Sequence, residues 1–306
     1  MDTNKYIPTV EAIEKASGVL EEILEPTPFQ KNQNLSDIYG ANIFLKREDL
    51  QMVRSYKIRG AYNKIRTIEP ELLKNGIVCA SAGNHAQGVA FSCNKLQIMG
   101  SIFMPTTTPK QKIEQVRMFG REFIEIILTG DTFDAANSAA IKYAKENDKT
   151  FIPPFDDPKV MEGQGTIGRE ILSQSKVKLD YVFVPIGGGG LASGLGSYLK
   201  QMSPETKIIG VEPGGAPCMK EAIKAGKVVK LDHIDKFVDG AAVQEAGSLT
   251  YQVCKEVLDD IVVVPEGAVC TTIIQMYNKS AIVVEPAGAL SSAALRFYAD
   301  EIKGKN

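Results

Sequence analysis

Short apolar runs alternate with amphipathic segments through the first half of the chain. The runs have the length of buried strands, and the amphipathic segments repeat apolar residues at helical spacing. The predicted strands are residues 42–48, 77–81, 101–104 and 123–128, and the predicted helices are residues 84–96, 109–119 and 132–146. Strands that alternate with helices in this way predict a parallel sheet with helices on its faces. In the last helix, one apolar face is formed by Phe133, Ala136, Ala140, Tyr143 and Ala144.

Prolines mark two boundaries in this pattern. Thr108-Pro109 is a favourable helix start, because proline is tolerated at the first helical position. Residues 151–160, FIPPFDDPKV, contain three prolines and interrupt the regular alternation. We interpret this segment as a crossing between two domains.

A second α/β set follows the proline-rich segment. Its predicted strands are residues 181–186, 208–212 and 261–264, with a helix at residues 191–201 after the first of them. The chain has 306 residues, which is more than one hydrophobic core usually supports. The sequence therefore predicts an α/β protein with two domains.

Composition and charge exclude several classes of protein. Hydrophobic residues make up 44% and charged residues 24% of the chain, as in an ordinary globular protein. The net charge of −2 gives no field that would recruit nucleic acid or an anionic membrane. Residues 1–17 show no signal-peptide pattern, and no apolar run approaches the roughly 18 residues of a membrane span. We expect a cytoplasmic protein.

Cysteine and histidine are too few and too scattered for a metal site. The five cysteines include no C-x-x-C pair, so neither a disulfide framework nor a zinc site is indicated. With only His85 and His233, a histidine metal cluster is excluded. We expect buried free thiols and no bound metal.

Three short segments carry candidate chemistry, and the first is Ser55-Tyr56-Lys57-Ile58-Arg59-Gly60-Ala61-Tyr62. A lysine near a helix start is usually a solvated surface residue. A lysine nucleophile must instead be partly desolvated, so that its amine is neutral often enough to attack a carbonyl carbon and to accept protons. The octapeptide alone does not decide between these interpretations for Lys57.

The second segment, Ser81-Ala82-Gly83-Asn84-His85, follows a predicted strand and opens a predicted helix. Unpaired N–H groups at such a helix start form an anion site that suits a carboxylate. Gly83 would let the backbone approach a ligand closely. An ordinary helix cap is the alternative, and His85 has no local indication beyond a pocket wall or a satisfied polar group.

The third segment is the tetraglycine loop, Gly187-Gly188-Gly189-Gly190, which lies with Leu191 at a predicted strand-to-helix turn. Glycine N–H groups before a helix are suited to hold a phosphate. A rival interpretation is a dinucleotide fingerprint, Gly187-x-Gly189-x-x-Ala192, with Glu212 ending the next strand. This segment alone does not exclude a nicotinamide enzyme, and the other two segments argue against it.

In this order and spacing, the three segments resemble the fold-type-II pyridoxal-phosphate (PLP) enzymes, the tryptophan synthase β-like family. Flanking motifs resemble the biosynthetic threonine dehydratases over nearly the whole chain. These motifs are LKREDL at 45–50, SAGNHAQGVA at 81–90, MPTTTP at 104–109, LTGDTFD at 128–134 and VEPAGA at 284–289. The resemblance implies two doubly wound open-sheet domains. The large PLP-binding domain would comprise residues 1–50 and 155–306, and the small domain would comprise residues 51–154.

The resemblance also implies a role for each candidate residue. Lys57 would carry the cofactor covalently, and Asn84 would contact the cofactor's 3-oxygen. The substrate carboxylate would be bound by the loop of Ser81, Ala82, Gly83, Asn84 and His85. The cofactor phosphate would be held by the backbone of Gly187, Gly188, Gly189, Gly190 and Leu191. Glu285 would line the cofactor pocket, with a structural carboxylate as the alternative.

The implied reaction is α,β-elimination, in which the Lys57 amine removes the Cα proton. L-threonine would give 2-oxobutanoate and ammonia for isoleucine biosynthesis, and L-serine would give pyruvate. The alternatives are a catalytically incomplete PLP-binding fragment, a serine racemase and a cysteine-synthase-like enzyme. Family members pair through their catalytic domains, so a homodimer is expected.

The sequence departs from its relatives in three places. Ala82 stands where serine racemases carry a serine base, which predicts elimination without racemisation. Cys218 replaces an oxygen ligand in the pattern through which those relatives bind a divalent ion, so no metal requirement is expected. After Asn306 the family continues with an apolar strand, whose serine meets the cofactor's pyridine nitrogen, and a regulatory domain. We expect an open sheet edge in this chain.

Overall fold

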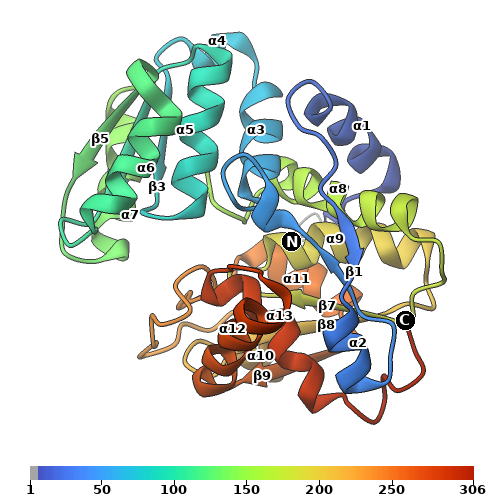
Figure 1. Cartoon of the computed structure of the whole chain (residues 1–306). Coiled ribbons are helices and arrows are strands. Elements are labelled where there is room, and N and C mark those ends of the chain that lie inside the picture. The colour runs from blue at the N-terminus through green and yellow to red at the C-terminus, as the bar shows by residue number, and fades with distance from the viewer. Residues whose placement is uncertain (1–5) are drawn as a thin grey trace.

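Two parallel sheets, each covered by helices, organise the protein in the computed structural model (Figure 1). The structure describes residues 6–306. Residues 1–5, which begin the segment without a signal-peptide pattern, lie outside the described residues. Helices α8 and α9 run through the middle of the molecule between the two sheets (Figure 1). The predicted α/β class is confirmed.

The first unit is built on a four-stranded sheet in the order β5-β4-β3-β6, and all its strands are parallel. The strands are β3 (Ile77–Ala80), β4 (Gly100–Met104), β5 (Ile124–Leu128) and β6 (Thr150–Phe151). The helices are α3 (Lys57–Arg66), α4 (Pro70–Leu73), α5 (Asn84–Leu96), α6 (Lys110–Gly120), the 3₁₀ turn η2 (Arg121–Phe123) and α7 (Phe133–Glu146).

Helices cover both faces of this sheet because successive strand residues point to opposite sides. Ile77 and Cys79 pack in one apolar cluster with residues of α3, α5 and α6. Val78 and Ala80 pack in a second cluster with Ala140 and Ala144 of α7. The unit is therefore doubly wound, as the resemblance implied.

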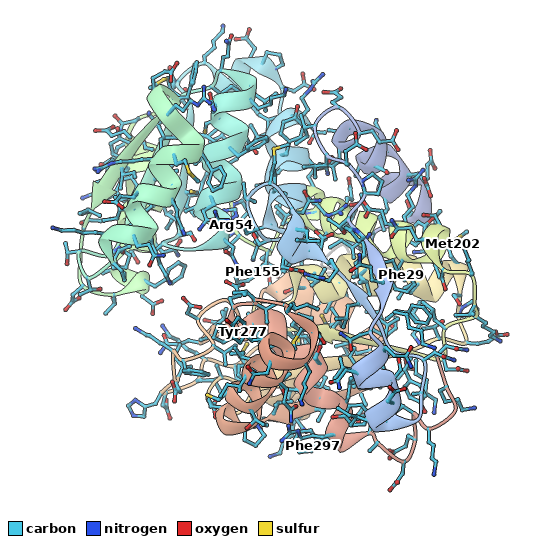
Figure 2. The ribbon with its side chains drawn as sticks, viewed as in Figure 1. Phe29, Arg54, Phe155, Met202, Tyr277 and Phe297 are labelled. Atoms are coloured by element: carbon cyan, nitrogen blue, oxygen red, sulfur yellow. The ribbon has the colours of Figure 1, made fainter. Side chains whose placement is uncertain are left out.

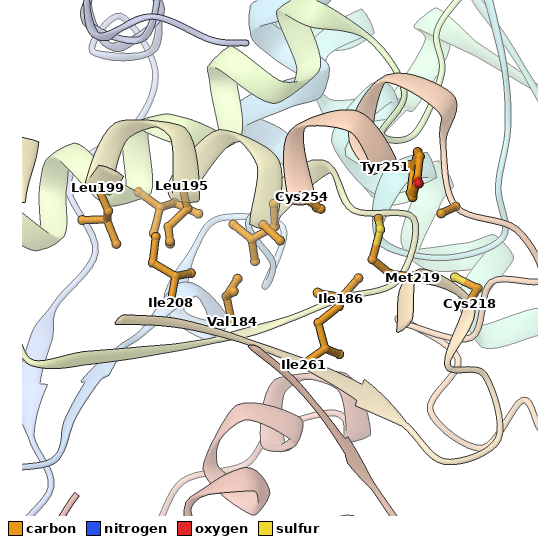
Figure 3. Packing of buried hydrophobic residues seen from close by; sticks show 14 of the residues in the cluster. Val184, Ile186, Leu195, Leu199, Ile208, Cys218, Met219, Tyr251, Cys254 and Ile261 are labelled. Atoms are coloured by element: carbon orange, nitrogen blue, oxygen red, sulfur yellow. The ribbon is translucent and has the colours of Figure 1, made fainter. Parts of the chain in front are cut away.

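The second unit is built on a parallel sheet in the order β7-β8-β9, whose strands are β7 (Tyr181–Pro185), β8 (Lys207–Pro213) and β9 (Asp260–Val264). Leu195 and Leu199 lie above Val184 and Ile208 in its core (Figure 3). One face carries α9 (Gly190–Met202), α10 (Cys218–Ala225) and α11 (Ser248–Val257). The other face carries α12 (Glu266–Ser280) and α13 (Pro286–Ala294), and Leu295 of the turn η3 (Leu295–Phe297) packs near Phe183 of β7.

The N-terminal part packs against this second unit and against the central helix α8. Its elements are α1 (Val10–Leu20), β1 (Phe29–Lys31), α2 (Gln33–Tyr39), β2 (Phe44–Lys46) and the turn η1 (Glu48–Leu50). Strands β1 and β2 form a separate antiparallel pair. Among the described residues, β7 pairs only with β8, so its other edge has no neighbouring strand. At the beginning of β7, the Asn306 carbonyl accepts hydrogen bonds from the N–H groups of Asp180 and Tyr181.

Helix α8 (Pro158–Gln174) lies between α3 and α9, and glycines permit both contacts. A Cβ atom on Gly163 would lie 2.6 Å from the Arg59 carbonyl oxygen of α3. A Cβ atom on Gly194 of α9 would overlap the Met161 carbonyl oxygen of α8. Close backbone packing through α8 thus fixes α3 relative to α9.

Several predicted boundaries were wrong. The strand expected at 42–48 is shortened to Phe44–Lys46, because Glu48–Leu50 turns into a 3₁₀ helix. Pro109 has ψ of 139° and precedes the first helical residue instead of starting the helix. Phe133 is 43% exposed, although it was assigned to the buried face of its helix. It lies in the first turn of α7, at the mouth of the cleft described below.

The segment at 151–160 is more structured than a simple crossing. Thr150–Phe151 adds the fourth strand of the first sheet, and α8 begins at Pro158 with Asp157 as its N-cap. Only residues 152–157 lack a helix or strand. Prolines there obscured a short strand and a proline-started helix in the sequence pattern.

Cysteine side chains agree with the expectation of free thiols. Cys79, Cys93, Cys218 and Cys254 are buried, and Cys270 is partly exposed. In residues 6–306, no helix is both long and apolar enough to cross a lipid bilayer.

Candidate active site

A cavity of about 1670 Å³ opens between the two units. Its walls include the starts of α3 and α5, the loop before α9 and the segment at 152–157. The structure brings every predicted site residue to this one cavity: Lys57, Ser81, Ala82, Gly83, Asn84, His85, Gly187, Gly188, Gly189, Gly190, Leu191 and Glu285. Their individual roles remain predictions.

Lys57 is the first residue of α3 and is partly buried in the cavity wall. Its Nζ donates a hydrogen bond to the Pro154 carbonyl oxygen at 3.1 Å and lies 5.7 Å from the Tyr56 ring centre. Burial lowers the pKa of Lys57 to about 8, and the charge of Glu285 acts in the opposite direction. An amine with this pKa is partly neutral near pH 7, as a nucleophile and proton acceptor requires.

The loop before α5 has the geometry of a helix N-terminus open to the cavity. Helix α5 begins at Asn84 with Gly83 as its N-cap, and the Ser81 hydroxyl accepts a hydrogen bond from the Gly83 N–H at 3.1 Å. The first N–H groups of a helix have no intrahelical acceptor. The loop therefore offers backbone donors and a favourable dipole to an anion in the cavity.

Asn84 and Glu285 meet across the cavity. The Asn84 side-chain Nδ2 donates to Glu285 Oε1 at 2.7 Å. Glu285 is the N-cap residue of α13, so this hydrogen bond joins the two units. Desolvation within the cleft raises the pKa of Glu285, and the Asn84 hydrogen bond opposes that change.

His85 is buried beside the cavity and satisfied by the backbone. Its Nε2 lies 3.0 Å from the Ile152 carbonyl oxygen, which can only accept, so Nε2 carries the proton. Burial and the charge of Lys57 lower the pKa of His85 to about 3. A neutral imidazole fixed in this way is a positioned wall residue and not a general acid at neutral pH.

The tetraglycine loop is packed too closely for side chains. Gly189 has φ of +96°, a conformation that favours glycine. A Cβ atom on Gly188 would overlap the Phe155 ring, and one on Gly190 would lie 2.9 Å from the Phe155 Cβ. Glycine is therefore required here by close packing as well as by backbone conformation.

Hydrogen bonding around this loop leaves its donors free. The Gly188 carbonyl accepts from the Thr250 hydroxyl at 2.5 Å and from the Gly247 N–H at 3.3 Å. Among the described residues, the N–H groups of Gly187, Gly188 and Gly189 have no acceptor within the protein. With the first turn of α9 they form a concave set of donors suited to a phosphate.

Glu212 contradicts the dinucleotide interpretation. Its carboxylate is fully buried and accepts from the N–H groups of Met219 at 2.7 Å and Lys220 at 2.8 Å. Both oxygens therefore cap α10, and Glu212 is not among the residues that line the cavity. A cavity that combines Lys57, the loop before α5 and the tetraglycine loop suits a phosphate-bearing aldehyde better than a dinucleotide.

Comparison with known proteins agrees with this geometry. Residues 20–306 match the family described as "Pyridoxal-phosphate dependent enzyme". The chain belongs to the pyridoxal-phosphate dependent enzyme family. Among its relatives is a biosynthetic L-threonine dehydratase of Halalkalibacterium halodurans, which is 57% identical over 296 residues, covering 97% of this chain and 71% of the relative.

Solved structures of this family share the fold. The processed form of threonine deaminase isoform 2 from Solanum lycopersicum is 40% identical, with a TM-score of 0.92 over 97% of this chain and 81% of that chain. Maize serine racemase is 29% identical, with a TM-score of 0.91 over 98% and 92% of the two chains. The fold-type-II assignment and the PLP cofactor are confirmed.

Sequence reasoning missed the backbone carbonyls that hold Lys57 and His85. They belong to Pro154 and Ile152, within a segment interpreted only as a domain crossing. Its prolines were a signal of fixed backbone geometry, but the sequence does not show which side chains such carbonyls meet.

Proposed function

We propose that the chain is a PLP-dependent L-threonine ammonia-lyase that forms 2-oxobutanoate and ammonia. L-serine, which lacks one methyl group, would give pyruvate, because a methyl group changes binding by only about 1–3 kcal/mol. One observation carries the proposal. A desolvated Lys57 amine and two sets of free backbone donors line a single cavity, in a chain 57% identical to a biosynthetic L-threonine dehydratase. The product would enter isoleucine biosynthesis.

Each part of the cavity has a defined task in this proposal. PLP, when bound, supplies a sink for the negative charge that develops at the substrate Cα. The backbone of Gly187 to Leu191 holds its phosphate, while Asn84 and Glu285 line the space beside its ring. The donors at the start of α5 bind the substrate carboxylate. The Lys57 amine, neutral above its pKa of about 8, removes the Cα proton.

Ala82 supports elimination without racemisation. Racemisation requires a second group that delivers a proton to the opposite face of the substrate, and an alanine methyl cannot do so. Ala82 lies in the carboxylate-binding loop and lines the cavity. We therefore expect no D-serine from L-serine, in contrast to the activity that the maize relative's name states.

We also propose the organisation in which this site works. The two sheets support a small domain of residues 51–154 and a large domain of residues 1–50 and 155–306, with the site between them. We expect two copies to pair as a homodimer in the cytoplasm, as the resemblance to the family implies. Sedimentation of the purified chain tests the dimer.

The open edge of β7 favours a second candidate function. The cavity continues along β7 past Val182 and Val184, opposite Phe44 and Leu45 of β2. Solvent that enters the cavity along β7 would weaken the exclusion of water from the site. A chain that binds PLP without turnover is therefore the alternative.

Product analysis decides between these functions. The PLP-loaded chain is incubated with L-threonine and with L-serine, and 2-oxobutanoate, pyruvate and D-serine are measured. The proposal expects both oxoacids and no D-serine. PLP binding without either oxoacid would support the second candidate, and D-serine would contradict the role assigned to Ala82.

A further inference from the structure

Residues 152–157 lie where the two units meet, between β6 and α8. Phe155 lies at the centre of the molecule, between the two units (Figure 2). The segment has the sequence IPPFDD and no helix or strand, yet Ile152 through Asp156 contact each part of the candidate site. Its role is not explained by connecting two domains.

The first half of the segment holds two side chains of the site by backbone carbonyls. The Ile152 carbonyl meets His85 Nε2 at 3.0 Å, and the Pro154 carbonyl accepts from Lys57 Nζ at 3.1 Å. Ile152 is anchored in turn, because its N–H donates to Val78 of β3 at 2.8 Å. Pro153 and Pro154 have fixed φ angles and restrict the residues before them. Pro153 therefore restricts the direction of the Ile152 carbonyl, and the two fixed φ angles limit the paths by which the chain brings the Pro154 carbonyl to Lys57.

The second half holds the tetraglycine loop. The Phe155 ring packs directly on Gly188, where no side chain would fit. The Asp156 carboxylate accepts from the N–H groups of Leu249 at 2.9 Å and Thr250 at 3.1 Å. The Thr250 hydroxyl then donates to the Gly188 carbonyl. Phe155 and Asp156 thus support the loop directly and through α11.

A ligand with a phosphate at one end and an aldehyde at the other requires a fixed span between its two anchors. Lys57 and the tetraglycine loop belong to elements far apart in the sequence, and the segment at 152–157 touches both. We propose that residues 152–157 are a positioning element that sets this span, with the Pro154 carbonyl as the acceptor that orients the Lys57 amine. The inference rests on the proposed function, in which Lys57 is the reacting amine.

The first test loosens the Pro154 carbonyl. In Pro154→Gly apoprotein, Lys57 is labelled with trinitrobenzenesulfonate over a range of pH, and its peptide is quantified by mass spectrometry. Losing a carbonyl acceptor that favours the ammonium form lowers the titration midpoint of Lys57 relative to that of the parent, so labelling at pH 7 rises by about threefold or more. In the loaded enzyme, kcat falls about tenfold while KM changes less than twofold, because the carboxylate donors are untouched.

The matched control is Pro70→Gly, at the exposed N-terminus of α4. It removes a proline from a helix start outside the cavity, so Lys57 labelling and kcat should equal those of the parent. Equal changes in both variants would overturn the proposal, and so would parental labelling in Pro154→Gly. If Pro154→Gly does not fold, Pro154→Ala provides the same test, because it also frees the backbone at residue 154.

The second test separates the two halves of the segment. Phe155→Leu removes the ring that supports Gly188 and should weaken PLP binding about tenfold in equilibrium dialysis, with Lys57 labelling as in the parent. Pro154→Gly should show the opposite result: its Lys57 labelling changes, while its affinity for inorganic phosphate equals that of the parent. If Phe155→Leu alters labelling and leaves PLP affinity unchanged, the assignment is wrong. The labelling and binding measurements require no turnover. A chain without lyase activity would therefore overturn the proposed function, while these measurements would still decide whether residues 152–157 position the site.

Discussion

Lys57 and His85 are both basic side chains whose pKa is lowered by burial, with different consequences. The pKa of Lys57 moves to about 8, which makes its amine available as a base. The pKa of His85 moves to about 3, which keeps its ring neutral and fixed on the Ile152 carbonyl. Similar desolvation thus produces a reactive group in one case and a structural group in the other.

His85 should make the protein sensitive to mild acid. The unfolded chain binds a proton at His85 below its ordinary pKa of 6.5, whereas the folded protein does not until about 3. Stability therefore falls as the pH decreases through this window, by about 1.4 kcal/mol between pH 7.5 and 5.5 from this group alone. Urea unfolding at the two pH values should show a loss smaller by that amount in His85→Gln, which retains a donor for Ile152. Equal losses in parent and variant would contradict the assignment.

At the residue scale, the sequence predicted side chains better than backbone partners. Lys57, Asn84 and Glu285 were expected in one site because the motifs around them resemble a known family, and all three line the cavity. The hydrogen bond between Asn84 and Glu285 was not expected, since it depends on how the two units meet. The Pro154 carbonyl gave no signal because every residue carries the same acceptor.

At the element scale, close glycine contacts join α3 to α9 through α8. Gly163→Ala would place a methyl group 2.6 Å from the Arg59 carbonyl and should reduce the free energy of unfolding by about 1–3 kcal/mol. Gly267→Ala is the control, because this helical glycine has nothing within 4 Å of the added methyl group. It should stabilise the protein by about 0.4–1 kcal/mol. Urea unfolding measures both, and a stabilising Gly163→Ala would disprove tight packing at that helix pair.

The turn from β8 into α10 lacks good ligands for a divalent ion, so we expect activity without one. Both Glu212 oxygens already bond N–H groups of α10, and the adjacent Cys218 offers a thiol whose pKa is raised by burial. Burial also raises the pKa of Glu212 to about 7, which further weakens it as a cation ligand near neutral pH. We expect 2-oxobutanoate formation to be unchanged after dialysis against chelator. Activity lost in chelator and regained with magnesium would refute this prediction.

Hydrophobic periodicity located most of the strands in the described residues and the helices α5, α6, α7 and α9, but not the remaining helices. Strands β3, β4, β5, β7, β8 and β9 each lie within about two residues of the predicted ranges. Strand β6 was missed because Thr150–Phe151 is too short to show alternation and directly precedes the prolines. Phe133 was misassigned because helical spacing alone does not show that the first turn of α7 lies at the cleft mouth.

Across the whole molecule, two ion pairs of opposite polarity bridge the cleft. Lys112 of α6 pairs with Asp239, and Asp134 of α7 pairs with Lys230 at 2.8 Å. In each pair one residue belongs to the first unit and the other to the loop that leads into α11. All four residues line the cavity, so the two pairs join its walls.

Reversing one of these pairs should open the cleft. Asp239→Lys places two cations opposite each other and should raise KM for L-threonine about threefold, since an exposed pair contributes only about 0.2–1 kcal/mol. Adding Lys112→Asp restores the attraction and should return KM toward the parent value. Steady-state kinetics at low ionic strength measure all three proteins. Additive effects of the two substitutions would show that this pair does not control the cleft.

The whole assignment depends on Lys57, because we expect the cofactor to be bound covalently to its amine. The decisive measurement is to load the chain with PLP, reduce it with borohydride, digest it and locate the cofactor by peptide mass spectrometry. We expect the cofactor mass on the peptide that contains Lys57, and no cofactor-bearing peptide from Lys57→Ala after the same reduction. The cofactor mass on another lysine of the parent, or on any lysine of Lys57→Ala, would contradict this assignment.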